Sequence, residues 1–350
     1  MRRAPRIGSL AAGAALVVVS ALFAPAGAAT PTGAAKTSGP GPCPGLVALE
    51  VAGHQICTHG GDDLANLPPS PSLGAPPGAA LRSASVPPAP CPGDGMSGRR
   101  VRVLYGYPDG THDRSAEMRA GIRLALRSAD ANLDAQTPET GGQHYRFWCK
   151  KDSTPTIASV RLRAIGADHA YSVADVIDSL VAQRSLGFGP RDFVDDRFVY
   201  LTFVDHLQGV SAPAGQATFL GDDDPDPAAN RNNSTSQMHY GMVMLGYSAA
   251  NETHLFQHEV GHTIGAVQLS SPHSSGAAHC YDVADVMCYN DGGPYFSGGG
   301  TLQPLCVAMP DGQDPWDCGG DDWYAASPAD GTYLANHWNV ADSGWLSWTT

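Results

Sequence analysis

The sequence predicts an α/β fold with a mixed sheet, two or three helices and a loop-rich C-terminal subdomain. Short runs rich in β-branched and aromatic residues are typical of strands, and two longer segments repeat apolar residues every three or four positions, as amphipathic helices do. Hydrophobic residues make up 42% of the 350-residue chain, which is enough for a substantial core.

The structured part of the chain is expected to begin near Arg100. Phe198–Val204 is a nearly continuous apolar run, which is typical of a strand that is covered on both faces. The polar, Gly/Pro/Asn-rich stretch from Gly209 to Gln237 is expected to be a loop. In chain order, the expected elements are a strand at Val101–Tyr105, a helix at Ser115–Ala135, strands at Tyr145–Cys149 and Ala158–Leu162, a helix at Val173–Leu186 and a strand at Phe198–Val204.

The N-terminal residues have the features of a secretory signal peptide. Three arginines precede the apolar run Leu10–Phe23, and the small residues Ala26–Ala28 follow it. A basic start, a short apolar centre and small residues at the exit indicate a cleaved leader, residues 1–29, and an exported protein. The Pro-rich composition of residues 30–99 indicates a pro-segment or linker, with a small bridged hairpin between Leu46 and Gly60.

The charge of the chain argues against nucleic acid as its partner. Lys and Arg number 21 against 34 Asp and Glu, which gives a net charge of -13. Proteins that bind the phosphate backbone carry clustered positive charge instead. No stretch after the leader is apolar enough over about 18 residues to span a membrane.

Eight cysteines fit an oxidising compartment, where an even number permits four disulfides. Spacing alone cannot fix their connectivity, because eight cysteines allow about 105 pairings. Pairing between neighbours is favoured for short loops. The expected pairs are Cys43–Cys57, Cys280–Cys288 and Cys306–Cys318, which leaves Cys91 for Cys149.

A metal-binding motif lies in the segment His254–Gly265, which contains His258-Glu259-x-x-His262. Residues four apart share one face of a helix, so both histidines can bind one cation. Glu259 then lies beside them, where it can take a proton from a water held at the metal. Asn251 is the expected N-cap of this helix, and Gly265 is expected to end it.

The third zinc ligand is left open by the motif. Gly265 follows His262 by three residues, as in the extended motif His-Glu-x-x-His-x-x-Gly-x-x-His, whose last histidine would fall at position 268. This chain has Gln268 there, and an amide oxygen is a poor zinc ligand. The candidates for the third ligand are His279, His273, Asp282, Asp285, and Gln268 itself or water.

Downstream residues favour His279 among these candidates. Met287, followed two residues later by Tyr289, resembles the Met-turn of metzincin metalloproteases, in which a methionine packs beneath the metal. In the astacin and serralysin branches, a tyrosine at that spacing contacts the metal or the oxyanion. If Cys280 pairs with Cys288, the bridge ties His279 to this turn and holds it close to the zinc.

The stretch from about Cys91 to Leu346 resembles secreted actinobacterial proteins of the metzincin type. The helix motif carries the similarity, together with the pattern His-Cys-x-Asp-x-x-Asp-x-Met-Cys-Tyr over His279–Tyr289 and the C-terminal segments Asp317–Tyr324 and Ala335–Asn339. The resemblance implies an α+β zincin fold with zinc-dependent peptidase activity, and it favours His279. We expect a metallopeptidase catalytic domain over residues 100–305 and a disulfide-containing C-terminal subdomain over residues 306–350.

Weaker features have ordinary alternatives. The acidic segments Asp222–Asp226 and Asp311–Asp322 could hold Ca²⁺, but they lack the spacing of a calcium hand, so solvated acidic loops are favoured. Cys57 could cap the zinc as a latency thiolate, although its disulfide with Cys43 is favoured. A cluster of C-terminal tryptophans could bind sugar, although a packed aromatic subdomain is the simpler account: Trp316, Trp323, Trp338, Trp345 and Trp348.

We therefore predict a secreted, monomeric zinc endopeptidase that acts on a protein or peptide substrate, with no nucleic-acid partner and no membrane partner after the leader is removed. His258, His262 and His279 bind Zn²⁺, Glu259 is the general base, and Tyr289 stabilises the oxyanion. The alternative is a catalytically impaired, metzincin-like extracellular binding protein whose tryptophans carry the function. Hydrolysis of a non-peptide amide in cell walls is a third interpretation.

Overall fold

The structure is a computed structural model that describes residues 43–51, 53–63, 88–137, 140–149, 154–163, 171–183, 197–205, 213–246, 249–305 and 315–349. These residues all belong to one compact unit, Ala34–Thr350. The predicted signal peptide, residues 1–29, lies outside the described residues. No helix among the described residues is long and apolar enough to cross a lipid bilayer.

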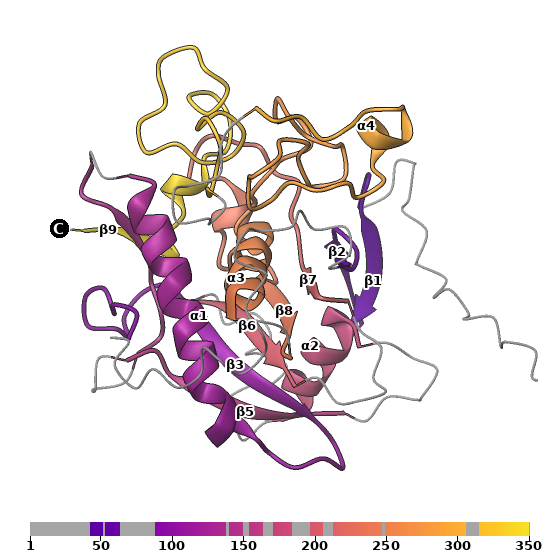
Figure 1. The fold of residues 1–350 in the computed structure, drawn as a ribbon, viewed down its shortest axis with the longest axis vertical. Helices are drawn as coiled ribbons and strands as arrows, with labels where there is room; N and C mark the ends of the chain where they lie inside the picture. Colours follow the sequence, from indigo (N-terminus) through magenta and orange to yellow (C-terminus); the bar gives the residue numbers. More distant parts are fainter. Residues whose placement is uncertain are drawn as a thin grey trace, which may run out of the picture. The chain divides into compact units, whose positions relative to one another are not determined.

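A five-stranded mixed sheet with the order β5-β3-β6-β8-β7 runs through this unit (Figure 1). Four strands are parallel, and β7 pairs antiparallel with β8 at one edge. The predicted strands β3, β5 and β6 are confirmed, whereas β7 lies inside the stretch that was expected to be loop. The strands are β3 (Arg100–Pro108), β5 (Ile157–Leu162), β6 (Phe198–Val204), β7 (Gly215–Ala217) and β8 (Tyr240–Met244).

The sheet separates two apolar cores, because successive residues of a strand point to opposite faces. On β3, Val103 and Tyr105 enter one core, and Leu104 between them enters the other. Every residue of β6 is buried, as its continuous apolar run predicts for a central strand.

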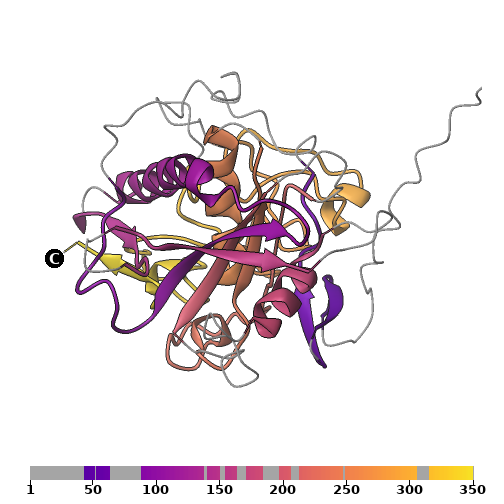
Figure 2. The same ribbon diagram turned by 90° about the horizontal axis from the view of Figure 1, so that it is seen from below.

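Helices cover both faces of the sheet, which confirms the α/β class (Figure 2). Helix α1 (Ser115–Ala135) and helix α3 (Ala249–Thr263) contribute to one core, and helix α2 (Val173–Ala182) contributes to the other. A capping box between Ser172 and Asp175 starts α2, which ends four residues short of the predicted Leu186. Residues 184–186 lie outside the described residues.

A disulfide-bridged hairpin precedes the sheet in the sequence. Its strands β1 (Val47–Val51) and β2 (His54–Thr58) pair antiparallel, and the Cys43–Cys57 disulfide joins its two ends. The predicted hairpin and its bridge are thereby confirmed. The predicted Cys91–Cys149 and Cys280–Cys288 disulfides are also present. Cys306, the predicted partner of Cys318, lies outside the described residues.

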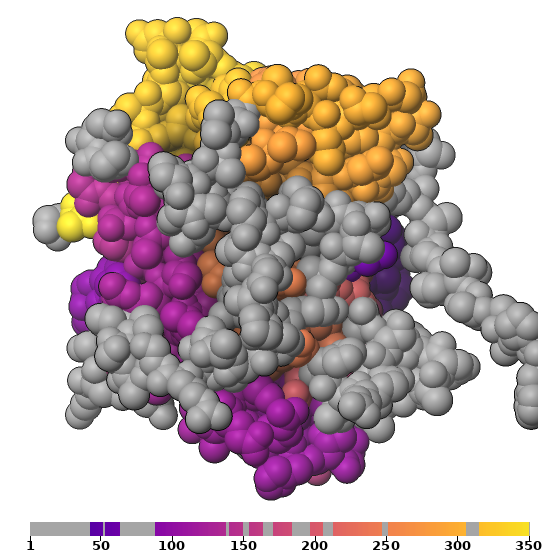
Figure 3. All heavy atoms as spheres, in the orientation of Figure 1, coloured from indigo at the N-terminus to yellow at the C-terminus, as the bar shows by residue number. Residues whose placement is uncertain are grey.

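The C-terminal residues pack against the loops that follow α3, where the yellow and orange atoms meet in Figure 3. Strand β9 (Leu346–Trp348) pairs with β4 (Gln143–Tyr145). The strand predicted at Tyr145–Cys149 is wrong beyond Tyr145, because Phe147 and Cys149 form only isolated bridges. The other elements within the described residues are helix α4 (Pro294–Ser297) and short 3-10 turns at Arg231–Asn233 and Val340–Asp342. Four tryptophans are at most 1% exposed, which confirms the packed aromatic account: Trp316, Trp323, Trp338 and Trp345.

Candidate metal centre

Helix α3 carries the His-Glu-x-x-His motif, and all three motif side chains are completely buried. The helix begins at Ala249, so Asn251 lies inside its first turn, and the prediction that Asn251 caps the helix is wrong. The two alanines ahead of Asn251 are strong helix formers, which accounts for the earlier start.

Gly265 ends α3 as predicted, in a Schellman motif. The backbone N–H of Gly265 donates to the carbonyl of His262, and that of Ala266 donates to the carbonyl of Gly261. Gly265 has φ of 87°, in the left-handed region that favours glycine, and a Cβ there would lie 2.3 Å from Cγ of Asn232. The chain therefore turns away immediately after the second histidine of the motif.

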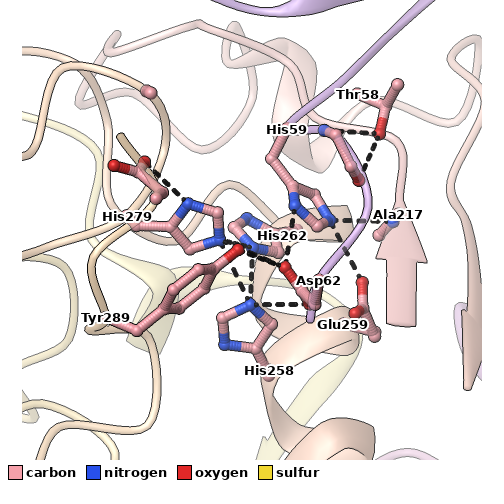
Figure 4. Close-up of polar contacts among 12 residues, drawn as sticks. Thr58, His59, Asp62, Ala217, His258, Glu259, His262, His279 and Tyr289 are labelled. Atoms are coloured by element: carbon pink, nitrogen blue, oxygen red, sulfur yellow. Dashed lines mark hydrogen bonds and ion pairs between the residues drawn. The ribbon is translucent and has the colours of Figure 1, made fainter. Parts of the chain in front are cut away.

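Three histidine side chains converge on one point (Figure 4). Nε2 of His262 lies 3.0 Å from Nε2 of His258 and 3.1 Å from Nε2 of His279, and the latter two atoms are 3.3 Å apart. His258 and His262 come from consecutive turns of α3, and His279 comes from the loop beyond it. The structure thus brings together the three histidines that the sequence analysis selected as metal ligands.

In two of these rings, the hydrogen bond made by Nδ1 leaves the lone pair of Nε2 facing the other histidines. Nδ1 of His258 donates to the backbone carbonyl of Val286 at 2.8 Å, and Nδ1 of His279 lies 3.0 Å from Oδ2 of the Asp291 carboxylate. A neutral imidazole carries one N–H, so Nε2 of both rings is an acceptor. Two acceptors that face each other at 3.3 Å repel unless a cation lies between them.

Burial works against a protonated ring at His262 and at His279. Burial lowers the pKa of His262 well below its usual range, because a charged ring would lose its hydration there. Burial likewise lowers the pKa of His279 to about 4, against the opposing effect of Asp291. Neutral imidazoles with converging Nε2 atoms and a carboxylate behind one ring are a donor set that suits Zn²⁺.

The turn after His279 lies beneath this group of histidines. The Cys280–Cys288 disulfide closes the loop that connects His279 to Met287. Met287 is fully buried, and a Cβ on Gly261 would lie 2.7 Å from its sulfur, so the methionine packs directly against the α3 backbone between the two motif histidines. The aromatic ring of Tyr289 lies 4.3 Å from that of His279.

The other candidates for the third ligand have different partners. The side-chain amide of Gln268 donates to the backbone carbonyls of Gly265 and Leu220. Nδ1 of His273 lies 3.0 Å from Oδ2 of Asp322, in a separate group that includes Asp321. Asp285 accepts from the backbone N–H groups of Met287 and Cys318, and Asp282 accepts from that of Leu305, so both aspartates brace loops.

Glu259 lies between the histidines and the edge of the sheet. A Cβ on Gly215 of β7 would lie 1.8 Å from Oε1 of Glu259, so the absence of a side chain at Gly215 makes room for this carboxyl. Burial raises the pKa of Glu259 well above its usual range, and the negative charge of the nearby Asp62 raises it further. Oε2 of Glu259 lies 3.2 Å from Nε2 of His59.

Sequence reasoning missed two residues of this centre, His59 and Asp62, which follow strand β2. The ring of His59 stacks on that of His262, with centroids 3.8 Å apart and planes inclined by 14°. Oδ2 of Asp62 lies 3.3 Å from Nε2 of His258, and Tyr289 donates its hydroxyl hydrogen to Oδ1 of Asp62. Within the Leu46–Gly60 hairpin, the sequence offered only Cys57 as a possible zinc ligand and favoured its disulfide with Cys43, which is present. His59 and Asp62, just beyond Cys57, are the residues that enter the site.

The residues present fit a zinc ion. Oδ2 of Asp62 is buried and has no hydrogen-bond partner among the described residues, and Asp62, His258 and His279 form one group whose possible ligand atoms lie within 4.8 Å of one another. Three neutral imidazoles and one carboxylate oxygen are the ligand types that tetrahedral zinc sites use. The bridged pair Cys280 and Cys288 is unsuited to binding a metal, because its sulfurs are joined to each other.

The acidic loop at Asp222–Asp226 binds its own backbone. Asp222 accepts from the N–H of Arg231, and Asp226 accepts from that of Ala228. Asp317, in the second acidic segment, accepts from the N–H groups of Trp323 and Tyr324. The largely exposed loop at Asp222–Asp226 agrees with the solvated-loop interpretation, whereas that interpretation is wrong for Asp317 and Asp322, which are buried. Asp311 lies outside the described residues.

No protein-family model matches the sequence, and no curated protein matches it. Among solved structures, metalloproteinase-II from Bacteroides fragilis aligns with 13% identity and a TM-score of 0.27, over 58% of this chain and 50% of that chain. Wild-type OgpA from Akkermansia muciniphila aligns with 13% identity and a TM-score of 0.32, over 67% and 66% of the two chains. Catalytically inactive OgpA with an O-glycopeptide substrate aligns with 11% identity and a TM-score of 0.30. The chain spans about half the length of the first of these proteins, and the function below rests on its own side chains.

Proposed function

We propose that this protein is a zinc-dependent endopeptidase. The observation that carries the proposal is the convergence of three buried histidine Nε2 atoms within 3.3 Å of one another, with the carboxyl of Glu259 on the same helix. Nε2 of His258 and Nε2 of His279 are acceptors that face the same point, which suits the group to a shared metal ion.

His258, His262 and His279 would hold the zinc, which when bound polarises a carbonyl and makes a nearby water more acidic. Glu259 is the base that takes the proton from the attacking water and returns it to the leaving amine. The hydroxyl of Tyr289, which points to the same place, donates a hydrogen bond to the oxyanion of the tetrahedral intermediate. Asp291 and the carbonyl of Val286 keep two of the rings in the orientation that presents Nε2.

The edge strand β7 supports a peptide as the substrate class. Extended peptides bind proteins by adding a strand to an exposed sheet edge, with backbone hydrogen bonds giving affinity. A segment of this same chain already follows β7: the backbone N–H of Asp62 donates to the carbonyl of Gly215, and that of Ala214 donates to the carbonyl of Asp62. Extended backbone therefore fits beside Glu259.

The remaining features fit an exported enzyme. Three disulfides suit an oxidising compartment. We infer a cleaved signal peptide over residues 1–29, a catalytic domain over residues 100–305, a C-terminal subdomain over residues 306–350, and a monomer that acts on protein or peptide. The binding-protein alternative relied on Gln268 and on accessible tryptophans, and the burial of four of those tryptophans counts against it.

The test is peptide-bond cleavage by the zinc-loaded chain, with cut positions in casein mapped by mass spectrometry. Because residues 57–62 lie over the site, activity is measured on the intact chain and on chain cut between Asp63 and Pro88. We expect internal cuts that disappear with Glu259→Gln while zinc content is retained. Zinc-loaded cut chain that leaves casein whole would contradict the proposal.

A further inference from the structure

We propose that Cys57–Asp62 is an inhibitory latch on the zinc centre, with Asp62 as a fourth metal ligand, and that breaking the chain between Asp63 and Pro88 releases it. The inference rests on the proposed function of the centre. In this arrangement, Asp62 occupies the fourth position at the metal, which the attacking water and the substrate carbonyl would otherwise use.

The backbone of the latch occupies the edge of the sheet. The N–H of Phe219 donates to the carbonyl of Cys57 at 2.9 Å, and the N–H of Asp62 donates to the carbonyl of Gly215 at 2.9 Å. Thr58 and Thr218 form an isolated antiparallel bridge between these two contacts. The latch thus runs antiparallel along β7, where it takes the backbone groups that an extended substrate would use.

The side chain of Asp62 reaches the point on which the histidines converge. Its Oδ2 lies 3.3 Å from Nε2 of His258, and its Oδ1 lies 3.8 Å from Nε2 of His279. The side chain is fully buried, and Oδ2 has no hydrogen-bond partner among the described residues. A carboxylate is an expensive group to bury, and a metal ion shared with three imidazoles offsets that cost.

His59 covers the remaining catalytic groups. Its ring lies flat against His262, and its Nε2 accepts from the backbone N–H of Ala217 at 2.9 Å. The same nitrogen lies 3.2 Å from Oε2 of Glu259, so the latch engages the catalytic base directly. The hydroxyl of Tyr289 also donates a hydrogen bond to Asp62. The three histidines, Glu259 and Tyr289 therefore all contact the latch (Figure 4).

The disulfides permit the latch to leave. Cys43 and Cys57 are bonded to each other, so no disulfide joins the hairpin to the rest of the chain. Residues 64–87 are the only covalent connection between the latch and the domain that follows it. Hydrolysis of one peptide bond there, with water as the second reactant, turns a tethered inhibitor into a separate polypeptide. While the chain is intact, the contact between the latch and the zinc centre is intramolecular and does not depend on dilution; after cleavage it is a contact between two molecules, which dilution weakens.

The first experiment places a single recognition sequence for a specific protease within residues 64–87 of the full chain. After cleavage and dilution to nanomolar concentration, we expect peptide turnover to rise on the order of 100-fold and the fragment ending near Asp63 to separate on gel filtration. Turnover by the intact chain that equals that of the cut chain would overturn the latch and leave the proposed function standing. Absence of turnover and of bound zinc in both forms would overturn the proposed function and the latch with it.

The second experiment reads the metal directly in the uncut chain. With Co²⁺ in place of zinc, Asp62→Ala should change the visible absorption spectrum, speed metal transfer to a chelator by about tenfold or more, and raise turnover. Asp63→Ala is the matched control, because it removes the neighbouring, exposed carboxylate, and it should change none of the three. Asp62→Asn serves the same comparison if the alanine variant folds poorly. An unchanged cobalt spectrum would overturn Asp62 as a ligand, and loss of turnover would make Asp62 part of the working site.

Discussion

Nδ1 of His279 lies 3.0 Å from Oδ2 of Asp291, and the two residues flank the loop that the Cys280–Cys288 disulfide closes. The Asp291 carboxylate also accepts from the hydroxyl of Ser275. One carboxylate therefore fixes the ring of His279 and the segment that precedes it, and sets which nitrogen of that ring faces His258 and His262.

We expect Asp291→Ala to weaken zinc binding by about 10–100-fold, because the ring of His279 loses the acceptor that orients it. Zinc affinity is measured by chelator competition on the purified chain. The neighbouring Asn290→Ala is the control, since that side chain is exposed and accepts only a local backbone N–H from Gly292. Equal zinc affinity in the Asp291 and Asn290 variants would show that this contact has no part in metal binding.

Tyr289→Phe should reduce kcat at least about tenfold while zinc content stays unchanged, because the lost hydroxyl contacts the oxyanion only in the transition state. The assay uses chain cut between Asp63 and Pro88. Tyr281→Phe removes the hydroxyl of another tyrosine in the same loop and should leave kcat as it is. Unaltered turnover in Tyr289→Phe would refute the role in catalysis.

Gly265→Ala should lower the free energy of unfolding by about 1–3 kcal/mol, because the added Cβ meets Asn232 and the backbone is in the left-handed region. Gly299→Ala separates the two causes. Gly299 has φ of 94° but open space around it, so only the backbone strain of about 1 kcal/mol applies there. Urea unfolding of both variants provides the comparison. A smaller loss at Gly265 than at Gly299 would rule out the clash with Asn232.

Glu252, at the start of α3, makes stability depend on pH. Burial raises the pKa of Glu252 to about 7 from 4.5, and the backbone N–H of Gly246 that it accepts offsets this only in part. A carboxyl with a raised pKa favours the folded state while it is protonated, so that contribution is complete below about pH 4.5 and is lost as pH rises through about 7. Relative to Glu252→Gln, the wild type should lose up to about 3 kcal/mol of stability over that window. Parallel pH curves for the two proteins would contradict the burial effect.

Elements with a clear periodic or apolar pattern in their own residues were predicted from the sequence. Helix α1 and strand β6 were predicted with the bounds they have, because each has an uninterrupted periodic or apolar pattern. Strand β7, with the sequence Gly-Gln-Ala, has no such pattern, and it is a strand because β8 offers it a pairing edge. The predicted N-cap at Asn251 was wrong because the helix begins two residues earlier, at Ala249.

The three histidines of the metal centre were predictable from the sequence, whereas His59 and Asp62 were not. The spacing of His258 and His262 on one helix, and the bridge that ties His279 to the turn at Met287, are local features that a sequence contains. Asp62 and His59 reach the site only because the hairpin packs beside β7, and no spacing in the sequence encodes that contact. The signal that could have identified them is the His-Gly-Gly-Asp segment immediately after a bridged hairpin.

The zinc affinity of the wild type beside His279→Ala and His273→Ala tests the centre most directly. The affinity is read by chelator competition, because His258, His262 and Asp62 would still leave three ligands in the His279 variant. We expect His273→Ala to match the wild type and His279→Ala to release zinc at a far lower chelator concentration. Zinc held as tightly in His279→Ala as in the wild type would contradict the assignment of His279 and the metal centre built on it.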